Sequence, residues 1–295
     1  MSVPPSGDGA RIVDRGYRRY DGPRSGTAGA VRSLARHSAQ RALGLRRGPW
    51  AKVLPVLAVA IAYLPAVAFV GMAAFLPNEL VTEGILPGYG DYYGFITSAI
   101  VVFTAFVAPE LLCTDRRTRM LGIYLASPLD RRTYLLAKGI AVGGVLSLVT
   151  LGPLLLLLVA YTFEGAGPDG PVAWFTILGR ILLGGIVIAT LHASISLAAA
   201  SLTDRKGLAS AGIILVLLVS SIVTGSLIDG AGAPVELEVF NLLGLPFDLV
   251  SRIYPDVEPV RPELGTEVLV AANLAWTLIA LGVVAVRYQR LEVNR

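Results

Sequence analysis

Three ionisable side chains lie inside long apolar stretches of this sequence: Glu110, Arg180 and His192. A charge at the centre of a bilayer costs on the order of 3 kcal/mol on insertion scales, so such residues often mark a pathway or a gate. We expect Glu110 to pair with an arginine at the inner face, with a hinge role as the alternative. Arg180 is expected to snorkel outward or to face an anionic group. His192 either hydrogen-bonds a neighbouring helix or serves a proton relay or pathway.

Motifs for other chemistry are absent from the sequence. Its three lysines, Lys52, Lys138 and Lys206, follow no G-x-x-x-x-G pattern, so the chain is not expected to bind ATP by itself. The sequence contains no H-E-x-x-H, C-x-x-C or G-x-S-x-G, and a single cysteine, Cys113, excludes an internal disulfide. We expect no metal or cofactor in this chain. We expect no nucleic-acid partner either, because the basic N-terminal region lacks interleaved aromatic residues.

A basic island separates two apolar stretches, with arginines and a lysine on both sides of a short apolar segment: Arg116, Arg117, Arg119, Arg131, Arg132 and Lys138. Within 119–126, apolar residues recur four positions apart: Met120 with Tyr124, and Leu121 with Leu125. This spacing predicts a brief amphipathic helix, which Ser127-Pro128 ends because proline cannot continue a helix. The island is either a solvated loop or a docking element for a cytoplasmic partner.

The composition indicates a membrane protein that is entirely helical. Mean hydropathy is +0.67 and charged residues make up only 16 % of the chain, whereas a soluble domain has about a quarter. Six stretches are long enough to cross roughly 30 Å of hydrocarbon, and the third and fourth are long enough to tilt or protrude. They are 51–76, 93–113, 134–161, 173–202, 208–228 and 266–286.

The distribution of basic residues predicts the orientation of these spans. Of the 25 lysines and arginines, 22 lie in the N-terminal region, the island, the 203–207 turn or the C-terminus. Only Arg180, Arg252 and Arg261 lie on the other side. Because cytoplasmic loops carry the excess of basic residues, both termini and the island are predicted to be cytoplasmic. We therefore expect a multi-pass protein of the plasma membrane.

The segments outside the spans have distinct characters. Residues 1–27 contain few large apolar groups and are predicted to form a disordered basic cytoplasmic tail. Residues 28–48 predict an amphipathic helix in the interface plane, with Val31, Leu34, Ala42 and Leu45 on one face. The outer loop, 229–265, holds an apolar stretch that Gly244 and Pro246 interrupt. It predicts one or two short helices that dip into the outer leaflet or pack on the bundle, with a plain outer cap as the alternative.

Two pairs of glycines within the spans permit close helix contacts. These pairs are Gly139-x-x-x-Gly143 and Gly184-Gly185.

This order of features resembles the permease subunits of ABC-2 type transporters, an exporter-like family. The best local match is the first cytoplasmic loop, which carries Pro109-Glu110-Leu111-Leu112, Asp115-Arg116-Arg117, Leu125-Ala126-Ser127-Pro128-Leu129 and Arg131-Arg132-Thr133-Tyr134-Leu135-Leu136-Ala137-Lys138. The resemblance covers roughly residues 28–290, a six-helix transmembrane domain that leaves 291–295 as a cytoplasmic C-terminus. It implies short outer helices before the last span and a coupling helix at 119–126.

The resemblance implies transport driven by a separate ATPase subunit, which would bind the ATP and Mg. The residues implied to couple to that ATPase are Arg116, Arg117, Arg119, Met120, Leu121, Tyr124 and Leu125. Two permease copies are expected, identical or homologous, because six spans make half a pathway. The cargo, exported across the lipid bilayer, is expected to be a lipid-like or amphipathic compound or drug, since the spans offer few polar groups. The alternatives are an intramembrane enzyme or a secondary transporter using Glu110, Arg180 and His192, although no convincing inverted repeat is present.

Overall fold

The computed structural model describes residues 22, 25–45, 48–75 and 86–291, and these residues form helices and turns without strands. Six helical segments in this part are long and apolar enough to cross a membrane, as predicted. They are α2 (Trp50–Phe75), α4 (Tyr92–Arg117), the segment Arg131–Phe163, α8 (Gly170–Leu202), the segment Lys206–Gly230 and α11 (Thr266–Arg290). The segment Arg131–Phe163 consists of α6 (Arg131–Thr150) and α7 (Gly152–Phe163). The segment Lys206–Gly230 consists of α9 (Lys206–Gly225) and η1 (Ser226–Gly230). The third and fourth spans are the longest, at 33 residues each.

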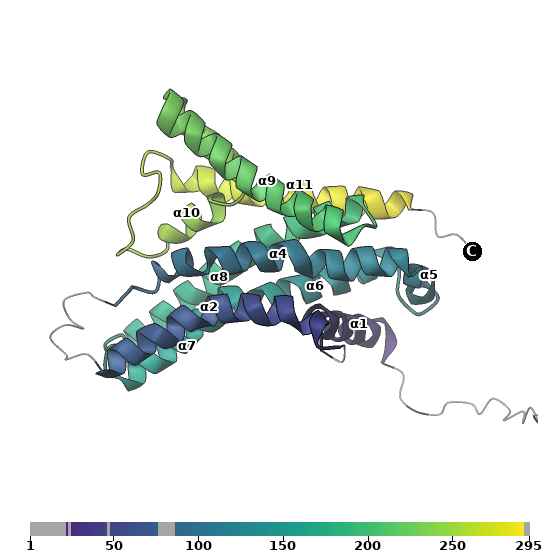
Figure 1. Ribbon diagram of the computed structural model, residues 1–295, viewed down its shortest axis with the longest axis horizontal. Helices are drawn as coiled ribbons and strands as arrows, with labels where there is room; N and C mark the ends of the chain where they lie inside the picture. Colours follow the sequence, from purple (N-terminus) through teal and green to yellow (C-terminus); the bar gives the residue numbers. More distant parts are fainter. Residues whose placement is uncertain (1–21, 23–24, 46–47, 76–85, 292–295) are drawn as a thin grey trace, which may run out of the picture.

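The bundle is centred on α4, which contacts α2, α6, α8 and α9. In its most apolar window 61 % of the residues are buried, against 17 % for α2 and for α9. Alanines at 58, 62 and 66 form the buried face of α2, and this four-residue spacing of small side chains lets α2 approach α4 closely. Helix α9 diverges from the other spans along its length (Figure 1). The outer surfaces of α2 and α9 therefore remain apolar and exposed.

The third span is interrupted between α6 and α7 at Leu151. Pro153 has no backbone N–H, so the ladder of i to i−4 hydrogen bonds cannot run through it. The Tyr63 hydroxyl donates to the Leu148 carbonyl at 2.9 Å beside this break. A Cβ on Gly152 would lie 1.7 Å from the same hydroxyl oxygen, so the tyrosine can approach only because residue 152 is glycine.

The two predicted glycine pairs behave differently. A Cβ on Gly185 would lie 2.0 Å from Leu151 Cδ2, and one on Gly184 would lie 2.9 Å from the Tyr93 hydroxyl. Gly184-Gly185 therefore allows α8 to approach its neighbours, as predicted. Within the described part of the chain, no atom lies within 4 Å of a Cβ built on Gly139 or Gly143.

Helix α1 (Gly26–Ala42) packs against α6 and α4 through Leu34, Ala35, Ser38 and Ala42. It starts two residues before the predicted 28–48 segment and ends earlier. Leu45, predicted on the apolar face, is 47 % exposed. That prediction is wrong because Gly44, with φ of +68°, turns the chain out of the helix one residue before Leu45. The predicted tail, residues 1–27, lies mostly outside the described residues.

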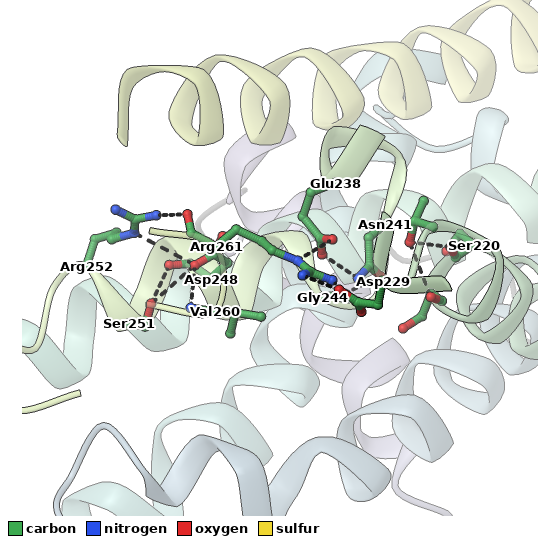
Figure 2. Close-up of polar contacts among 12 residues, drawn as sticks. Ser220, Asp229, Glu238, Asn241, Gly244, Asp248, Ser251, Arg252, Val260 and Arg261 are labelled. Atoms are coloured by element: carbon green, nitrogen blue, oxygen red, sulfur yellow. Dashed lines mark hydrogen bonds and ion pairs between the residues drawn. The ribbon is translucent and has the colours of Figure 1, made fainter. Parts of the chain in front are cut away.

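The outer loop forms a structured cap, held together by charged side chains (Figure 2). Arg261 makes a two-pronged ion pair with Asp229, at 2.7 and 2.9 Å, and its Nε lies 3.4 Å from Glu238 Oε2. Glu238 is buried and accepts a hydrogen bond from Asn241 at 2.6 Å. These carboxylates raise the pKa of Arg261, which stays charged.

Two short helices lie within this cap: η2 (Val235–Phe240), a 3₁₀ helix, and α10 (Leu245–Ser251). Helix α10 packs against α8 and α11, so the predicted short helices pack on the bundle. The Trp276 indole of α11 donates to the Val239 carbonyl at 2.7 Å, which fixes η2 to the last span.

The elements separate into two ends. Helix α1, the short helix α5 (Met120–Leu125), the α8–α9 turn and the C-terminal end of α11 lie at one end of the bundle (Figure 1). The α7–α8 turn and α10 lie at the opposite end. The first of these ends carries the basic island, and we call it the inner end.

Candidate functional site

Helix α5 lies across the inner end as a separate six-residue helix within the predicted 119–126 segment. The residue before it, Arg119, adopts a left-handed conformation with φ of 55°, which turns the chain sharply out of α4. After it, the Asp130 carboxylate accepts from the Thr133 amide at 2.7 Å, and the Asp130 amide donates to the Thr133 hydroxyl at 2.8 Å. This capping box starts α6, and the Thr133 hydrogen bonds lower the pKa of Asp130.

The side chains of α5 divide between the bundle and solvent. Leu121 and Tyr124 pack against the hydrophobic core. Ile123 points outward and is 64 % exposed. The sequence analysis missed Ile123, although it is the one large apolar residue of 119–126 outside the two predicted pairs.

Tyr124 belongs to a row of three tyrosine rings at the inner end. Its ring centroid lies 5.9 Å from that of Tyr134 on α6, and Tyr134 lies 5.9 Å from Tyr288 on α11. Both Tyr134 and Tyr288 are buried. We call these residues the tyrosine row. It connects α5 to two membrane spans, and Tyr124 is partly buried against its own chain.

Arg116, which the resemblance includes among the coupling residues, is partly buried and hydrogen-bonds to its own chain. Its Nη1 donates to the carbonyls of Ser201, at 2.7 Å, and Thr203, at 3.2 Å. The last carbonyls of a helix have no partner within that helix, so an arginine can satisfy them. Arg116 thereby ties the end of α8 to α4, while Arg117 and Arg119 are exposed.

Arg131 acts in the same way on the end of α11. Its guanidinium donates to the carbonyls of Tyr288, Gln289 and Leu291, at 3.2, 2.5 and 3.0 Å. The basic island is therefore partly a set of helix caps, and only some of its charges face solvent.

A buried ionic cluster lies behind α5, with Asp115 at its centre. The two carboxylate oxygens of Asp115 lie 2.6 Å from Arg41 Nη2 and 2.7 Å from Lys138 Nζ, and one also accepts from the Tyr134 hydroxyl at 2.9 Å. Lys138 Nζ donates further to Ser38 Oγ at 2.9 Å. These residues, the Asp115 cluster, join α1, α4 and α6. The sequence offered a signal for this cluster, because Asp115 is an acid inside a basic island.

Glu110, Arg180 and His192 are not brought together. Glu110 lies near the inner end, 2.6 Å from Lys206 Nζ. The prediction specified an arginine, and the described partner is a lysine from the start of α9. Both residues border a cavity of about 170 Å³ between α1, α2, α4 and α9.

His192 is fully buried in α8, with Nδ1 2.9 Å from the carbonyl of Ile188 in the same helix and its ring 6.1 Å from that of Phe247. The expected partner on a neighbouring helix is therefore replaced by the helix's own backbone. Arg180 borders a cavity near the α7–α8 turn, at the end opposite Glu110. Because the three residues do not converge, the described structure gives no catalytic centre built from them.

Within the described ranges, no group of three or more His, Cys, Asp or Glu side chains is placed to hold a metal ion. In a comparison with protein families, a family described as ABC-2 family transporter protein matches residues 71–287, well over half of the chain. No curated protein matches the sequence.

Proposed function

This chain belongs to the ABC-2 family of transporter proteins, and from that premise we propose that it is the permease of an exporter driven by a separate ATPase subunit. A permease of this family is the membrane component of a transporter and not itself an enzyme. The chain has the six membrane-spanning helices that such a component needs. The ATPase, the direction of transport and the cargo are the parts that we propose.

The observation that carries this proposal is the position of α5. It stands at the inner end with Ile123 exposed, next to the solvent-facing Arg117 and Arg119. An exposed apolar side chain within a basic rim is typical of an anchor that fills a pocket on a partner, with charges that steer the encounter. We infer that Ile123, with the partly exposed Met120 and Leu125, enters a groove of the ATPase.

The contacts of α5 with its own chain support a route for transmitting motion. The tyrosine row connects α5 to α6 and α11, and the Asp115 cluster connects α4 and α6 to α1. Buried ion pairs and packed rings resist continuous deformation, so a shift of α5 moves the attached helix ends together. Closure of the ATPase on ATP would supply that shift.

We propose that a second copy, or a homologue, completes the transport pathway. Six spans make half a pathway, and the exposed apolar surfaces of α2 and α9 leave area for such a contact. The scarcity of polar side chains in the spans favours a lipid-like or amphipathic cargo. The basic inner end is proposed to face the cytoplasm by the positive-inside rule.

Ile123→Ala tests the docking proposal, with Ile279→Ala as its control. Ile279 lies on α11, away from the proposed contacts, and is 54 % exposed, so both substitutions remove the same group from an exposed position. In the complex purified with its ATPase, Ile123→Ala should weaken ATPase binding by about 1–3 kcal/mol and reduce ATP-driven efflux. The control should bind the ATPase as the wild type does. Equal ATPase binding by the Ile123→Ala variant and the wild type would contradict docking through α5.

A further inference from the structure

A cavity of about 450 Å³ lies near the α7–α8 turn, at the end of the bundle away from α5. Its volume is in the range of ligand pockets, and its walls combine apolar and polar side chains. The apolar part includes Leu86, Ala173 and Ile177. The polar part consists of Tyr89, Tyr161, Thr176, Arg180 and Asp256.

Two hydroxyl groups at this cavity have no hydrogen-bond partner. Tyr161 is 4 % exposed and Tyr89 is partly buried, and the hydroxyl oxygens of both are shielded without a partner in the described part of the chain. Their rings lie 6.0 Å apart. Burial raises the pKa of Tyr89, so its hydroxyl stays a donor at neutral pH. Because neither hydroxyl oxygen has appreciable accessible surface, a ligand in the cavity meets the tyrosine rings and not their hydroxyls.

Arg180 differs from Arg252 and Arg261, the two arginines of the cap formed by 229–265. Arg261 pairs with Asp229 and Glu238, and Arg252 donates to two backbone carbonyls and lies near Asp248. No ion pair or hydrogen bond joins Arg180 to any described residue, although its side chain is partly buried. Its guanidinium carries five N–H donors in a planar fork that suits phosphate or carboxylate.

An acidic side chain stands at the same cavity without an ion pair to Arg180. Asp256 approaches the backbone at Gly88, where an added Cβ would lie 3.0 Å from Asp256 Oδ2 and 3.1 Å from Asp91 Oδ2. The cavity therefore presents separate sites of positive and negative charge. A ligand that carries both charges would match them, whereas a simple anion would leave Asp256 beside a like charge.

We propose that this cavity binds the headgroup of an amphiphile that carries a phosphate and a primary ammonium, as an aminophospholipid does. The phosphate accepts hydrogen bonds from the Arg180 guanidinium, and the ammonium lies near Asp256. The apolar walls take the first part of the acyl region. Such a molecule comes either from the surrounding bilayer or from the transported cargo, and its recognition chemistry is the same in both cases.

Binding is measured on the purified full-length chain in detergent, by native mass spectrometry with phosphatidylethanolamine or phosphatidylglycerol. Arg180→Gln should weaken binding of phosphatidylethanolamine about tenfold, because it removes a charge-assisted contact. The control is Arg205→Gln, an exposed arginine at the inner end whose side chain makes no hydrogen bond in the described structure. Unchanged binding in Arg180→Gln, or equal weakening in Arg205→Gln, would overturn the proposal.

Asp256→Asn tests the selectivity for an ammonium group. It should remove the preference for phosphatidylethanolamine over phosphatidylglycerol, because a neutral amide neither attracts the ammonium nor repels an anionic lipid. A preference that persists in Asp256→Asn would contradict the assigned place of the ammonium.

Tyr161→Phe is a second control. Because the Tyr161 hydroxyl oxygen is shielded from the cavity, its removal should leave lipid binding unchanged. Weaker lipid binding in Tyr161→Phe, at an unchanged melting temperature, would contradict the assignment of the phosphate to Arg180.

The source of the ligand follows from transport by the complete complex. If Arg180→Gln weakens lipid binding and slows ATP-driven lipid efflux, the molecule is cargo; if efflux is unchanged, it is a resident lipid. Both results support the site. The binding measurements need no ATPase, so they stand or fall independently of docking through α5.

Discussion

Lys138 Nζ lies 2.7 Å from Asp115 Oδ2, and both side chains have no exposed surface. The pair joins α6 to α4 one helical turn behind α5, and Arg41 adds a second cation from α1 at 2.6 Å. One carboxylate thus balances two buried or nearly buried cations. Removal of one member of a buried ion pair leaves the opposite charge uncompensated. Loss of the Asp115 carboxylate would strand two cations, so it should destabilise the fold more than loss of either cation.

Asp115→Asn should therefore destabilise the protein strongly. Loss of one partner of a buried pair costs about 3–5 kcal/mol, and here two cations lose their partner. The melting temperature in detergent is the measurement, with Asp204→Asn as the control because Asp204 is exposed in the α8–α9 turn at the same end of the bundle. The double variant Asp115→Asn, Lys138→Met should be less destabilised than the single variant, since it removes one stranded charge. A double variant as unstable as the sum of the singles would show that the two residues do not interact.

Gly185→Ala should destabilise the packing of α8 on the third span. The new methyl would lie 2.0 Å from Leu151 Cδ2 and 3.1 Å from the Thr150 carbonyl oxygen, and the backbone atom cannot move away easily. Overpacking of this kind costs about 1–3 kcal/mol. Gly179→Ala on the same helix is the matched control, because no described atom lies within 4 Å of its added methyl. Thermal unfolding should separate the two variants, and similar melting temperatures would argue against close packing at Gly185.

The spans could be predicted from the sequence because a bilayer accepts only segments that satisfy their own backbone hydrogen bonds. Helix α5 was predictable for a similar local reason, since its apolar spacing and the proline after it act within a few residues. The orientations of Arg116 and Tyr124 were not predictable in this way. These orientations depend on where α8 and α11 end in space. The carbonyls that Arg116 contacts lie 85 or more positions away in the sequence, and the ring that Tyr124 contacts lies on a separate helix.

The Asp115 cluster shows the same limit. Its charges were visible in the sequence, but the pairing requires α1 to return to α4 and α6, which brings Arg41 to a residue 74 positions away. The prediction for Leu45 failed for a local reason. The apolar spacing continues to Leu45, but Gly44, with positive φ, turns the chain out of α1 before that residue.

The capping box at the start of α6 should depend on pH in a defined direction. The pKa of Asp130 lies below its usual value of 3.8 because Thr133 donates to the carboxylate. A lowered pKa means that the carboxylate stabilises the folded state fully above about pH 4, and that this contribution is lost as the pH falls through the folded-state pKa. Amide exchange at the first turn of α6 should therefore become faster, relative to the rest of α6, below pH 3.8. Asp130→Ala should show the faster exchange at neutral pH already, and an unchanged exchange rate in that variant would contradict the cap.

The orientation of the inner end can be tested with single cysteines in a Cys113→Ser background. Cys113 is buried and its Sγ donates to the carbonyls of Ala200 and Thr203, contacts that a serine hydroxyl can replace. Residues 128 and 164 are exposed at opposite ends of the bundle. An impermeant thiol reagent applied to intact cells should label Glu164→Cys and leave Pro128→Cys unlabelled until the cells are opened. The reverse pattern would place the basic island outside.

Tyr124 and Ile123 should give different defects, because one faces the bundle and the other faces solvent. Truncation of Tyr124 to alanine removes the first ring of the tyrosine row and the contact of Lys138 Nζ, 5.6 Å from the ring centroid. The groups that face a partner remain in this variant. We expect Tyr124→Ala to keep most of its ATPase binding and to lose transport per ATP hydrolysed, since α5 no longer presses on Tyr134.

Ile123→Ala should do the reverse, with weaker ATPase binding but normal transport per ATP once the ATPase is supplied in excess. The ratio of cargo moved to ATP hydrolysed in reconstituted vesicles separates the two defects. Tyr124→Phe keeps the ring and is the control, expected to behave as the wild type. If Tyr124→Ala instead lost ATPase binding while its transport ratio stayed normal, the ring would belong to the docking surface and the tyrosine row would not transmit the motion.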